Sequence, residues 1–345
     1  MSEKQITLHG DRINGKLKFN CVKCDKITDA PTNTKRADKK LCRECYGKRK
    51  DTRVNELNDL IGKEWASLSR SVESYPGIRT ERQRKHGACF PVSLAEQQIR
   101  IYTKSGNLVL DPFMGVGTTA EAAKNLGRKS IGIEINEKFV KLAREDLKRS
   151  KDHKLICGDV KNILKYVKPN SVDFLLTSPP YGNLLKTVKG AFAYKWQEHS
   201  TLNKVKNPEP YSNSKKDLGN LPYNEFFIEI EKVFKDTYVT LKSNAYAVWV
   251  VKDYRDLKND VPLVNFHSDI ISVAKKVGFI LWDIKIYDQT KFRPLVVLGY
   301  PSKNYYLNIG HSYLLIFRKF IKGKNANKTD AKKNRKSKSS RKYKT

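Results

Sequence analysis

Short apolar runs alternate with helix-patterned stretches through the middle of the chain. The apolar runs predict buried strands over 107–111, 130–134, 155–157, 172–176, 245–251, 279–286 and 313–317. Apolar positions at helical spacing predict amphipathic helices over 118–126, 136–147, 224–241 and 268–277. Alternation of strands with helices is typical of a mostly parallel sheet covered on both faces, so the sequence predicts an α/β fold.

The composition divides the chain into four parts. Residues 1–50 are polar and contain four of the six cysteines, and residues 51–89 are predicted to be a helical, basic linker. Residues 90–320 carry nearly all the strong periodic patterns. Residues 321–345 contain 11 basic residues and one acidic residue, with almost nothing apolar, which predicts a disordered basic tail.

The net charge points to a polyanionic partner. The chain has 68 Lys and Arg residues against 36 Asp and Glu residues, a formal charge of +32. Such an excess of positive charge favours a nucleic acid as the binding partner and disfavours cationic ligands. The simpler alternative is that the charge serves only solubility. No run approaches the ~18 apolar residues of a membrane span, and the first residues lack a signal-peptide core. We therefore expect an intracellular, cytoplasmic protein that binds nucleic acid and no membrane.

The first chemical motif is the run Asp-Pro-Phe-Met-Gly-Val-Gly-Thr-Thr over 111–119, where a predicted strand turns into a helix. Gly115 and Gly117 let the backbone approach a ligand, and the helix start offers free amide donors. Glu134 ends the next predicted strand and Asp159 follows the third, so both acids lie at the same sheet edge. A simple turn explains the glycines alone, whereas the whole set indicates a nucleotide-type site.

The second motif is Thr-Ser-Pro-Pro-Tyr over 177–181, directly after the fourth predicted strand. Two prolines remove two backbone donors and stiffen the loop, which leaves carbonyl groups beside a hydroxyl and an aromatic ring. Such a loop can accept hydrogen bonds from an amino group while the ring stacks on a planar base. A plain loop is the alternative, but the position at the end of a strand in the same sheet favours a functional site.

Together the two motifs resemble those of the S-adenosylmethionine-dependent amino-methyltransferases of DNA, which modify N4 of cytosine or N6 of adenine. The resemblance extends over about 90–319 and implies a Rossmann-like methyltransferase sheet with helices on both faces. Residues 90–94 are similar to the family's segment that closes over the methionine part of the cofactor, and residues 311–319 to its closing strand.

The resemblance also implies roles for single residues. The cofactor-binding residues would be Phe90, Pro91, Asp111, Phe113, Gly115, Gly117, Thr118, Glu134 and Asp159. Among them, Glu134 would hold the ribose and Asp159 the adenine amine. The catalytic residues would be Ser178, Pro179, Pro180 and Tyr181. The target base would be swung out of the helix, Tyr181 would stack on it, and the Ser178 side chain and Pro179 carbonyl would accept the hydrogens of its amine.

Ser178 bears on which base is modified. Cytosine-N4 members of the family often carry serine at this position, so we favour N4 of cytosine over N6 of adenine. Methylation at cytosine C5 would need a nucleophilic cysteine, usually one that follows a proline. Neither Cys89 nor Cys157 follows a proline, and we interpret both as small core residues. An RNA amino-methyltransferase and a non-catalytic, zinc-bearing DNA-binding protein remain as alternatives.

The resemblance leaves the DNA-reading segment open. One candidate is the insert 182–221, which could also be a lid; it contains Lys186, Lys189, Tyr194, Lys195, Trp196 and His199. Another is the N-terminal module. The basic run Arg82, Arg84, Lys85 and His86 is either a solvated linker or a phosphate contact. We expect double-stranded DNA as the partner of a monomer, and the chain leaves open whether a cognate restriction endonuclease accompanies it.

Four cysteines form two C-x2-C pairs, Cys21 with Cys24 and Cys42 with Cys45, separated by 17 residues. Each pair forms a tight turn, and the spacing suits one tetrahedral zinc ion. Four thiolates leave no open position for a substrate, so the predicted zinc is structural. Two disulfides are the alternative, which an intracellular chain disfavours.

Overall fold

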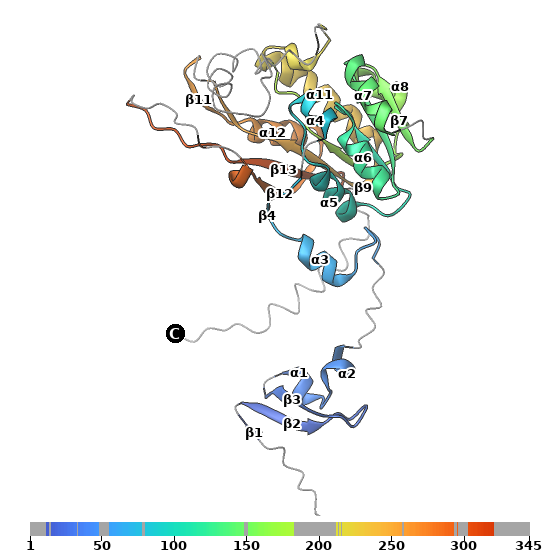
Figure 1. Cartoon of the computed structure of the whole chain (residues 1–345), viewed down its shortest axis with the longest axis vertical. Helices are drawn as coiled ribbons and strands as arrows, with labels where there is room; N and C mark the ends of the chain where they lie inside the picture. Colours follow the sequence, from blue (N-terminus) through green and yellow to red (C-terminus); the bar gives the residue numbers. More distant parts are fainter. Residues whose placement is uncertain are drawn as a thin grey trace, which may run out of the picture. The chain divides into compact units, whose positions relative to one another are not determined.

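The computed structural model describes residues 12–13, 15–32, 34–47, 55–77, 80–147, 151–182, 212, 214, 216–256, 259–292, 295 and 303–320. Two compact units, Met1–Glu56 and Leu57–Thr345, divide the chain (Figure 1). Most of the predicted insert and the whole predicted tail lie outside the described residues, including Lys186, Lys189, Tyr194, Lys195, Trp196 and His199. Among the residues described, no helix has the length and apolar character of a membrane span.

The N-terminal unit is a small antiparallel sheet with two short helices. Strands β1 (Arg12–Ile13), β2 (Lys16–Asn20) and β3 (Ile27–Pro31) pair in that order, and helices α1 (Lys35–Asp38) and α2 (Arg43–Gly47) follow. Its buried apolar cluster contains Phe19, Ala30 and Ala37. Because so small a core supplies little stability, a module of this kind needs a further cross-link.

The second unit is built on an eight-stranded sheet of order β4-β12-β13-β9-β8-β5-β6-β7. Five of the seven neighbouring pairs are parallel, and β13 runs antiparallel to both of its neighbours. The strands are β4 (Val72–Glu73), β5 (Leu108–Asp111), β6 (Lys129–Glu134), β7 (His153–Cys157), β8 (Val172–Thr177), β9 (Leu241–Val251), β12 (Ile280–Asp288) and β13 (His311–Arg318). A two-stranded sheet of β10 (Tyr254–Asp256) and β11 (Val261–Val264) was not predicted.

Helices cover both faces of the large sheet, which confirms the predicted Rossmann-like α/β methyltransferase fold (Figure 1). Helices α8 (Ile163–Tyr166), α11 (Tyr223–Thr240) and α12 (Phe266–Val277) contribute to one core cluster, and α5 (Val92–Tyr102) and α6 (Thr118–Asn125) to the other. Along β8, Phe174 and Leu176 belong to the second cluster and Leu175 to the first, as the two-residue period of a strand requires. Helix α7 (Glu137–Leu147) follows β6; α3 (Gly62–Leu68) and α4 (Glu81–His86) precede α5.

The segment 51–89 contributes Tyr75 to the core of the main unit, and its strand β4 pairs with β12. Two expectations from the sequence are corrected. Arg82 is buried and ion-paired with Glu121, so it is neither solvated nor a phosphate contact. Cys157 is exposed rather than a core residue, because β7 is the edge strand of the sheet, whereas Cys89 is half-buried.

Truncation of Trp249 should destabilise the main unit strongly. Its side chain is fully buried and stacks on Phe234, with ring centroids 4.0 Å apart and an interplanar angle of 16°. We expect Trp249→Ala to lower the free energy of unfolding by about 3–5 kcal/mol, measured by urea denaturation. Ile228→Ala is the control, since Ile228 is 60% exposed on α11. Equal effects of the two changes would contradict this account of the core.

Candidate functional site

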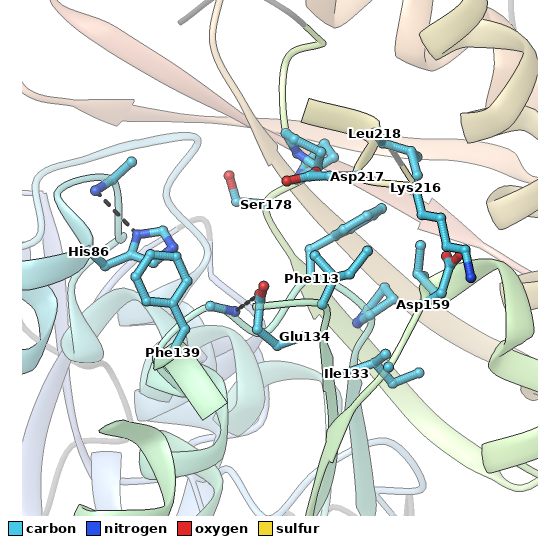
Figure 2. Close-up of a pocket in the computed structure, with 18 of the residues that line it drawn as sticks. His86, Phe113, Ile133, Glu134, Phe139, Asp159, Ser178, Lys216, Asp217 and Leu218 are labelled. Carbon is cyan, nitrogen blue, oxygen red and sulfur yellow. Dashed lines mark hydrogen bonds between the residues drawn. The ribbon is translucent and has the colours of Figure 1, made fainter. Parts of the chain in front are cut away.

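A pocket lies where the carboxyl ends of the central parallel strands meet (Figure 2). Strands β6 and β7 lie on one side of β5 in the sheet, and β8 lies on the other side. Where the strand order reverses in this way, the loops after the neighbouring strands diverge and leave a crevice. The pocket together with the solvent space at its open mouth occupies about 720 Å³. Predicted site residues that line it are Phe113, Gly115, Glu134, Asp159, Ser178, Pro179, Pro180 and Tyr181.

The glycines of the first motif are required by backbone conformation and close contact. Gly115 has φ +52° and Gly117 has φ +85°, both in the left-handed region. A Cβ atom on Gly117 would come within 3.0 Å of the Ala143 side chain, and one on Gly115 within 2.8 Å of His86 Nε2. The loop therefore passes directly beneath neighbouring side chains, with Gly115 at the pocket wall.

Asp111 lies behind the pocket rather than on its wall. Its buried carboxylate accepts hydrogen bonds from Thr119 Oγ1 and Thr177 Oγ1, both at 2.6 Å, and from the Phe113 amide at 3.1 Å. Burial raises the pKa of Asp111 to about 6. The side chain thus ties the first motif to the last residue of β8, directly before Ser178.

Four further predicted cofactor residues, Phe90, Pro91, Gly117 and Thr118, are not among the residues that line this pocket. Gln83 Nε2 donates to Thr118 Oγ1 at 3.1 Å and to the Phe90 carbonyl at 3.3 Å. Pro91 is the residue that precedes α5. Gln83 is almost completely buried and therefore joins the two segments around the pocket, a role that its sequence context does not reveal.

Two acidic side chains reach the pocket from β6 and from the turn after β7. Glu134 accepts hydrogen bonds from the Gly115 amide at 2.9 Å and the Asn136 amide at 2.8 Å. Burial raises the pKa of Glu134 to about 7. Asp159 accepts from the Lys161 amide at 3.0 Å and begins a short 3-10 helix. Both carboxylates can accept hydrogen bonds from a bound ligand.

The second motif forms the opposite wall of the pocket. The Tyr181 ring lies 4.7 Å from that of Phe266 and 6.2 Å, edge-on, from that of Tyr254. Asp217 also lines the pocket, and it accepts hydrogen bonds from the Gly219 amide at 2.8 Å and from Ser212 Oγ at 2.7 Å.

Other residues that line this pocket were not expected there, namely His86, Phe139, Lys216, Asp217 and Leu218. The sequence offered one signal among them, the Asp-x-Gly turn at 217–219. The rest come from helices and loops whose periodicity reveals only their local structure.

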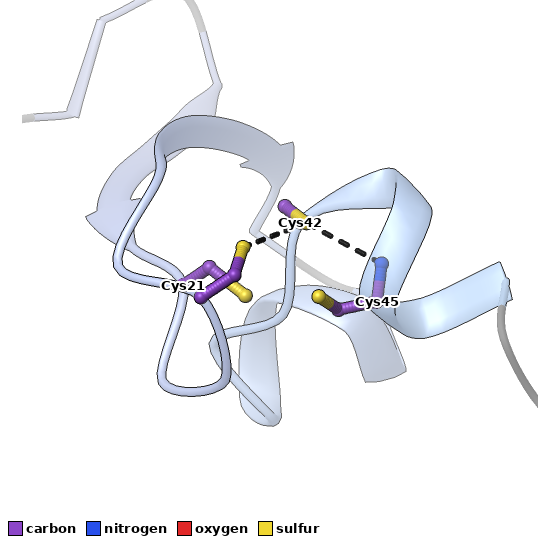
Figure 3. A group of neighbouring side chains, drawn as sticks. Cys21, Cys42 and Cys45 are labelled. Carbon is purple, nitrogen blue, oxygen red and sulfur yellow. Dashed lines mark hydrogen bonds between the residues drawn. The ribbon is translucent and has the colours of Figure 1, made fainter.

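The four predicted metal ligands lie together in the N-terminal unit (Figure 3). Their sulfur atoms are all within 4.8 Å of one another. Cys24 Sγ and Cys42 Sγ are 3.6 Å apart, and Cys42 Sγ accepts a hydrogen bond from the Cys45 amide at 3.3 Å. A tetrahedral zinc ion with Zn–S bonds of about 2.3 Å needs sulfurs about 3.8 Å apart, so the cluster fits such an ion.

Family models match two overlapping parts of the chain. One described as DNA methylase matches residues 17–145, and one described as RNA cap guanine-N2 methyltransferase matches residues 106–235. The chain is 40% identical over 95 residues to the type II methyltransferase M.BglI of Bacillus subtilis, covering 27% of each protein. It is 41% identical over 99 residues to the type II methyltransferase M2.DpnII of Streptococcus pneumoniae, covering 27% of this chain and 34% of that protein. The chain therefore resembles the DNA amino-methyltransferases, as its motifs predicted, although it matches about a third or less of the length of these two relatives.

Among solved structures, the chain matches TrmN from Thermus thermophilus at 18% identity and a TM-score of 0.39 over 69% of this chain and 52% of that one. A SAM-dependent O-methyltransferase from Thermotoga maritima has 14% identity and a TM-score of 0.38 over 68% and 66% of the two chains.

The Glu134 carboxyl should make the stability of the protein depend on pH. Because its pKa is raised from 4.5 to about 7 in the folded protein, the folded state holds the proton more tightly than the unfolded chain. The contribution of this carboxyl to the free energy of unfolding is fully present below about pH 4.5, and it is lost as the pH rises through about 7. Glu134→Gln should therefore become progressively more stable than the wild type over this range, measured by urea unfolding at several pH values.

The control for this prediction is Glu137→Gln, at an exposed position of α7 that is ion-paired with Lys141. The difference in unfolding free energy between Glu134→Gln and Glu137→Gln should widen across the same pH values. A constant difference would show that the Glu134 carboxyl does not titrate in this way.

Proposed function

We propose that the main unit transfers a methyl group from S-adenosylmethionine to an exocyclic amine of a base in duplex DNA. The observation that carries this proposal is that Gly115, Glu134 and the segment Ser178–Tyr181 line one pocket. The type II methyltransferases that the chain resembles support DNA as the substrate and a restriction-modification role.

The pocket residues fit S-adenosylmethionine, which when bound supplies a methyl group activated by a positively charged sulfur. The Glu134 carboxylate would accept hydrogen bonds from the ribose hydroxyls, and Asp159 would accept from the adenine amine. Gly115 lies at the pocket wall in the left-handed conformation, and its missing side chain leaves room for the His86 ring. Asp111 and Thr118 do not line the pocket, and they would contribute indirectly because their hydrogen bonds hold this loop in place.

The second motif would orient the target base. The base must leave the helical stack for its amine to be reached, and the Tyr181 ring would then stack on it. Ser178 Oγ and the Pro179 carbonyl would accept the two amine hydrogens, which turns the nitrogen lone pair toward the methyl group. As the nitrogen–carbon bond forms, the amine must lose one proton. Since a serine hydroxyl is a poor base, we assign the Asp217 carboxylate, which also lines the pocket, as the acceptor of this proton.

We propose N4 of cytosine as the methylated position, on the basis of Ser178, and N6 of adenine as the alternative. A second candidate is an exocyclic amine in RNA, which the match of residues 106–235 to the guanine-N2 methyltransferase model favours. All three reactions would use the same orientation of an amine.

We propose that the N-terminal unit binds one structural zinc ion through Cys21, Cys24, Cys42 and Cys45. The proposed organisation is a zinc module at 1–50, a segment 51–89, a methyltransferase domain at 90–320 and a basic tail at 321–345. The basic residues of the module, the insert 182–221 and the tail would contact the DNA backbone.

Substitution of the second motif should abolish methyl transfer without abolishing cofactor binding. We expect the double variant Ser178→Ala with Tyr181→Ala to lose at least about 99% of methyl incorporation into DNA, because it removes both the hydrogen-bond acceptor and the stacking ring. S-adenosylhomocysteine should still bind within a few-fold of the wild-type affinity.

The assay uses radiolabelled S-adenosylmethionine with parallel DNA and tRNA substrates, followed by nucleoside analysis of the product. N4-methylcytosine in DNA is the expected product. Label in N6-methyladenine alone would reject the preference for cytosine, and label in tRNA alone would reject DNA as the substrate. Undiminished transfer by the double variant would reject the site.

Zinc should bind to the N-terminal cysteines in a ratio of about one ion per chain. After dialysis against a chelator, Cys42→Ser should retain much less zinc than the wild type, because it removes one of the four thiolates. Cys157→Ser is the matched control, since Cys157 is exposed on β7 of the other unit. The measurement is metal analysis by mass spectrometry, and equal zinc in the two variants would contradict the assignment.

A further inference from the structure

A hydrogen-bonded Asp–His pair lies at the edge of the main sheet that carries the pocket. Asp253 follows β9, which runs parallel to β8, so the chain leaves the sheet there at the same edge as at Ser178. His267 lies in the first turn of α12. The Asp253 side chain is buried and that of His267 is half-buried, and neither residue is among the described residues that line the pocket.

The Asp253 carboxylate joins the chain that leaves β9 to the start of α12. It accepts hydrogen bonds from the His267 amide at 3.0 Å and from His267 Nδ1 at 2.8 Å. The imidazole also stacks on the Tyr313 ring of β13, with centroids 4.1 Å apart and an interplanar angle of 15°. Burial, the charge of Asp253 and a hydrogen bond to it raise the pKa of the Tyr313 hydroxyl. Because a buried carboxylate is costly without such partners, this arrangement resists displacement of either segment.

The residues next to this pair carry two aromatic rings that pack on Tyr181. Tyr254 follows Asp253, and its ring stands edge-on to that of Tyr181 at 6.2 Å. Phe266 precedes His267, and its ring lies 4.7 Å from that of Tyr181. One hydrogen-bonded pair therefore joins the two segments that hold these neighbours of the Tyr181 ring.

The two rings differ in how the rest of the fold holds them. Phe266 is fully buried and packs on two aromatic rings of α11, with centroids 5.7 and 5.8 Å away. Tyr254 is half-buried and begins β10, which pairs with β11 rather than with a strand of the main sheet. The hydrogen bonds of Asp253 fasten the chain directly before Tyr254 to the helix start that Phe266 anchors. Their loss would loosen Tyr254 and with it one of the contacts that orient Tyr181.

We infer that Asp253 and His267 are positioning residues for methyl transfer, which act by holding the Tyr254 ring against Tyr181. This inference rests on the proposed function, in which the Tyr181 ring stacks on the target base. The pair contributes to the alignment of the base amine with the methyl group, and it has no part in binding the cofactor.

The first measurement follows the Tyr181 ring directly. In protein labelled with fluorotyrosine, the fluorine resonance of Tyr181 is identified by its loss in Tyr181→Phe. We expect His267→Phe to shift or broaden this resonance, because the change keeps a ring beside Tyr313 but removes the Nδ1 donor. His267→Asn should leave the resonance near its wild-type position, since its amide can donate to Asp253 from a similar place.

The second measurement is methyl transfer to DNA by the same variants. His267→Phe should lower kcat by about tenfold or more, because a misplaced base reacts slowly even when the cofactor is bound. The Kd of S-adenosylhomocysteine should change by less than about twofold. His267→Asn should keep kcat within about threefold of the wild type, because it restores the hydrogen bond.

Glu73→Gln is the matched control, since it removes a buried ion pair from the same unit. Glu73 accepts a hydrogen bond from the buried Lys285 and lies on β4, which three strands separate from β8. This variant should change neither the Tyr181 resonance nor kcat.

Three results would overturn the inference. They are an unchanged Tyr181 resonance in His267→Phe, an undiminished kcat in that variant, and an equal effect of Glu73→Gln on the resonance. Absence of methyl transfer by the wild-type protein would refute the proposed function instead, whereas the resonance, which needs no substrate, still decides whether the pair positions Tyr181.

Discussion

The pocket depends on the hydrogen bonds of one buried carboxylate. Asp111 ends β5 and accepts hydrogen bonds from Thr119 in α6 and Thr177 in β8. A buried carboxylate is costly unless its oxygens are paired, and the raised pKa of Asp111, about 6, reflects that cost. Movement of either segment would deprive the carboxylate of one of its two threonine donors, so Asp111 holds the two motifs at one sheet edge although it does not line the pocket.

Strand order explains why the pocket forms at this place. Glu134 and Asp159 come from the side of β5 that holds β6 and β7, whereas Ser178 comes from β8 on the other side. The loops diverge between these strands and leave a crevice. Beneath it, Phe113 packs edge-on against Trp249 of β9, with ring centroids 6.2 Å apart. The floor of the pocket is therefore continuous with the largest core cluster, and its shape is set by packing rather than by a free loop.

The sequence predicted the features that depend on local patterns. Short apolar runs located the main strands, helical periodicity located the main helices, and the glycines and prolines marked both motifs. It did not predict features set by distant partners. From the sequence alone, Arg82 is expected at the surface. In the structure it is buried, and its charge is neutralised by Glu121, 39 positions away. Cys157 ends an apolar run that predicts burial, but β7 is at the sheet edge, so this residue is exposed.

The two units are stabilised in different ways, and this difference supports a structural role for the cysteine cluster. The main unit buries two large apolar clusters on opposite faces of its sheet. In the N-terminal unit, burial of Phe19, Ala30 and Ala37 contributes only a few kcal/mol, which is far less than the entropy lost by ordering its backbone. Cys21 and Cys24 lie in the turn after β2, and Cys42 and Cys45 lie at α2. An ion shared by these two pairs would join the segments that the small core leaves weakly connected, which is why we assign the zinc a structural rather than a catalytic role.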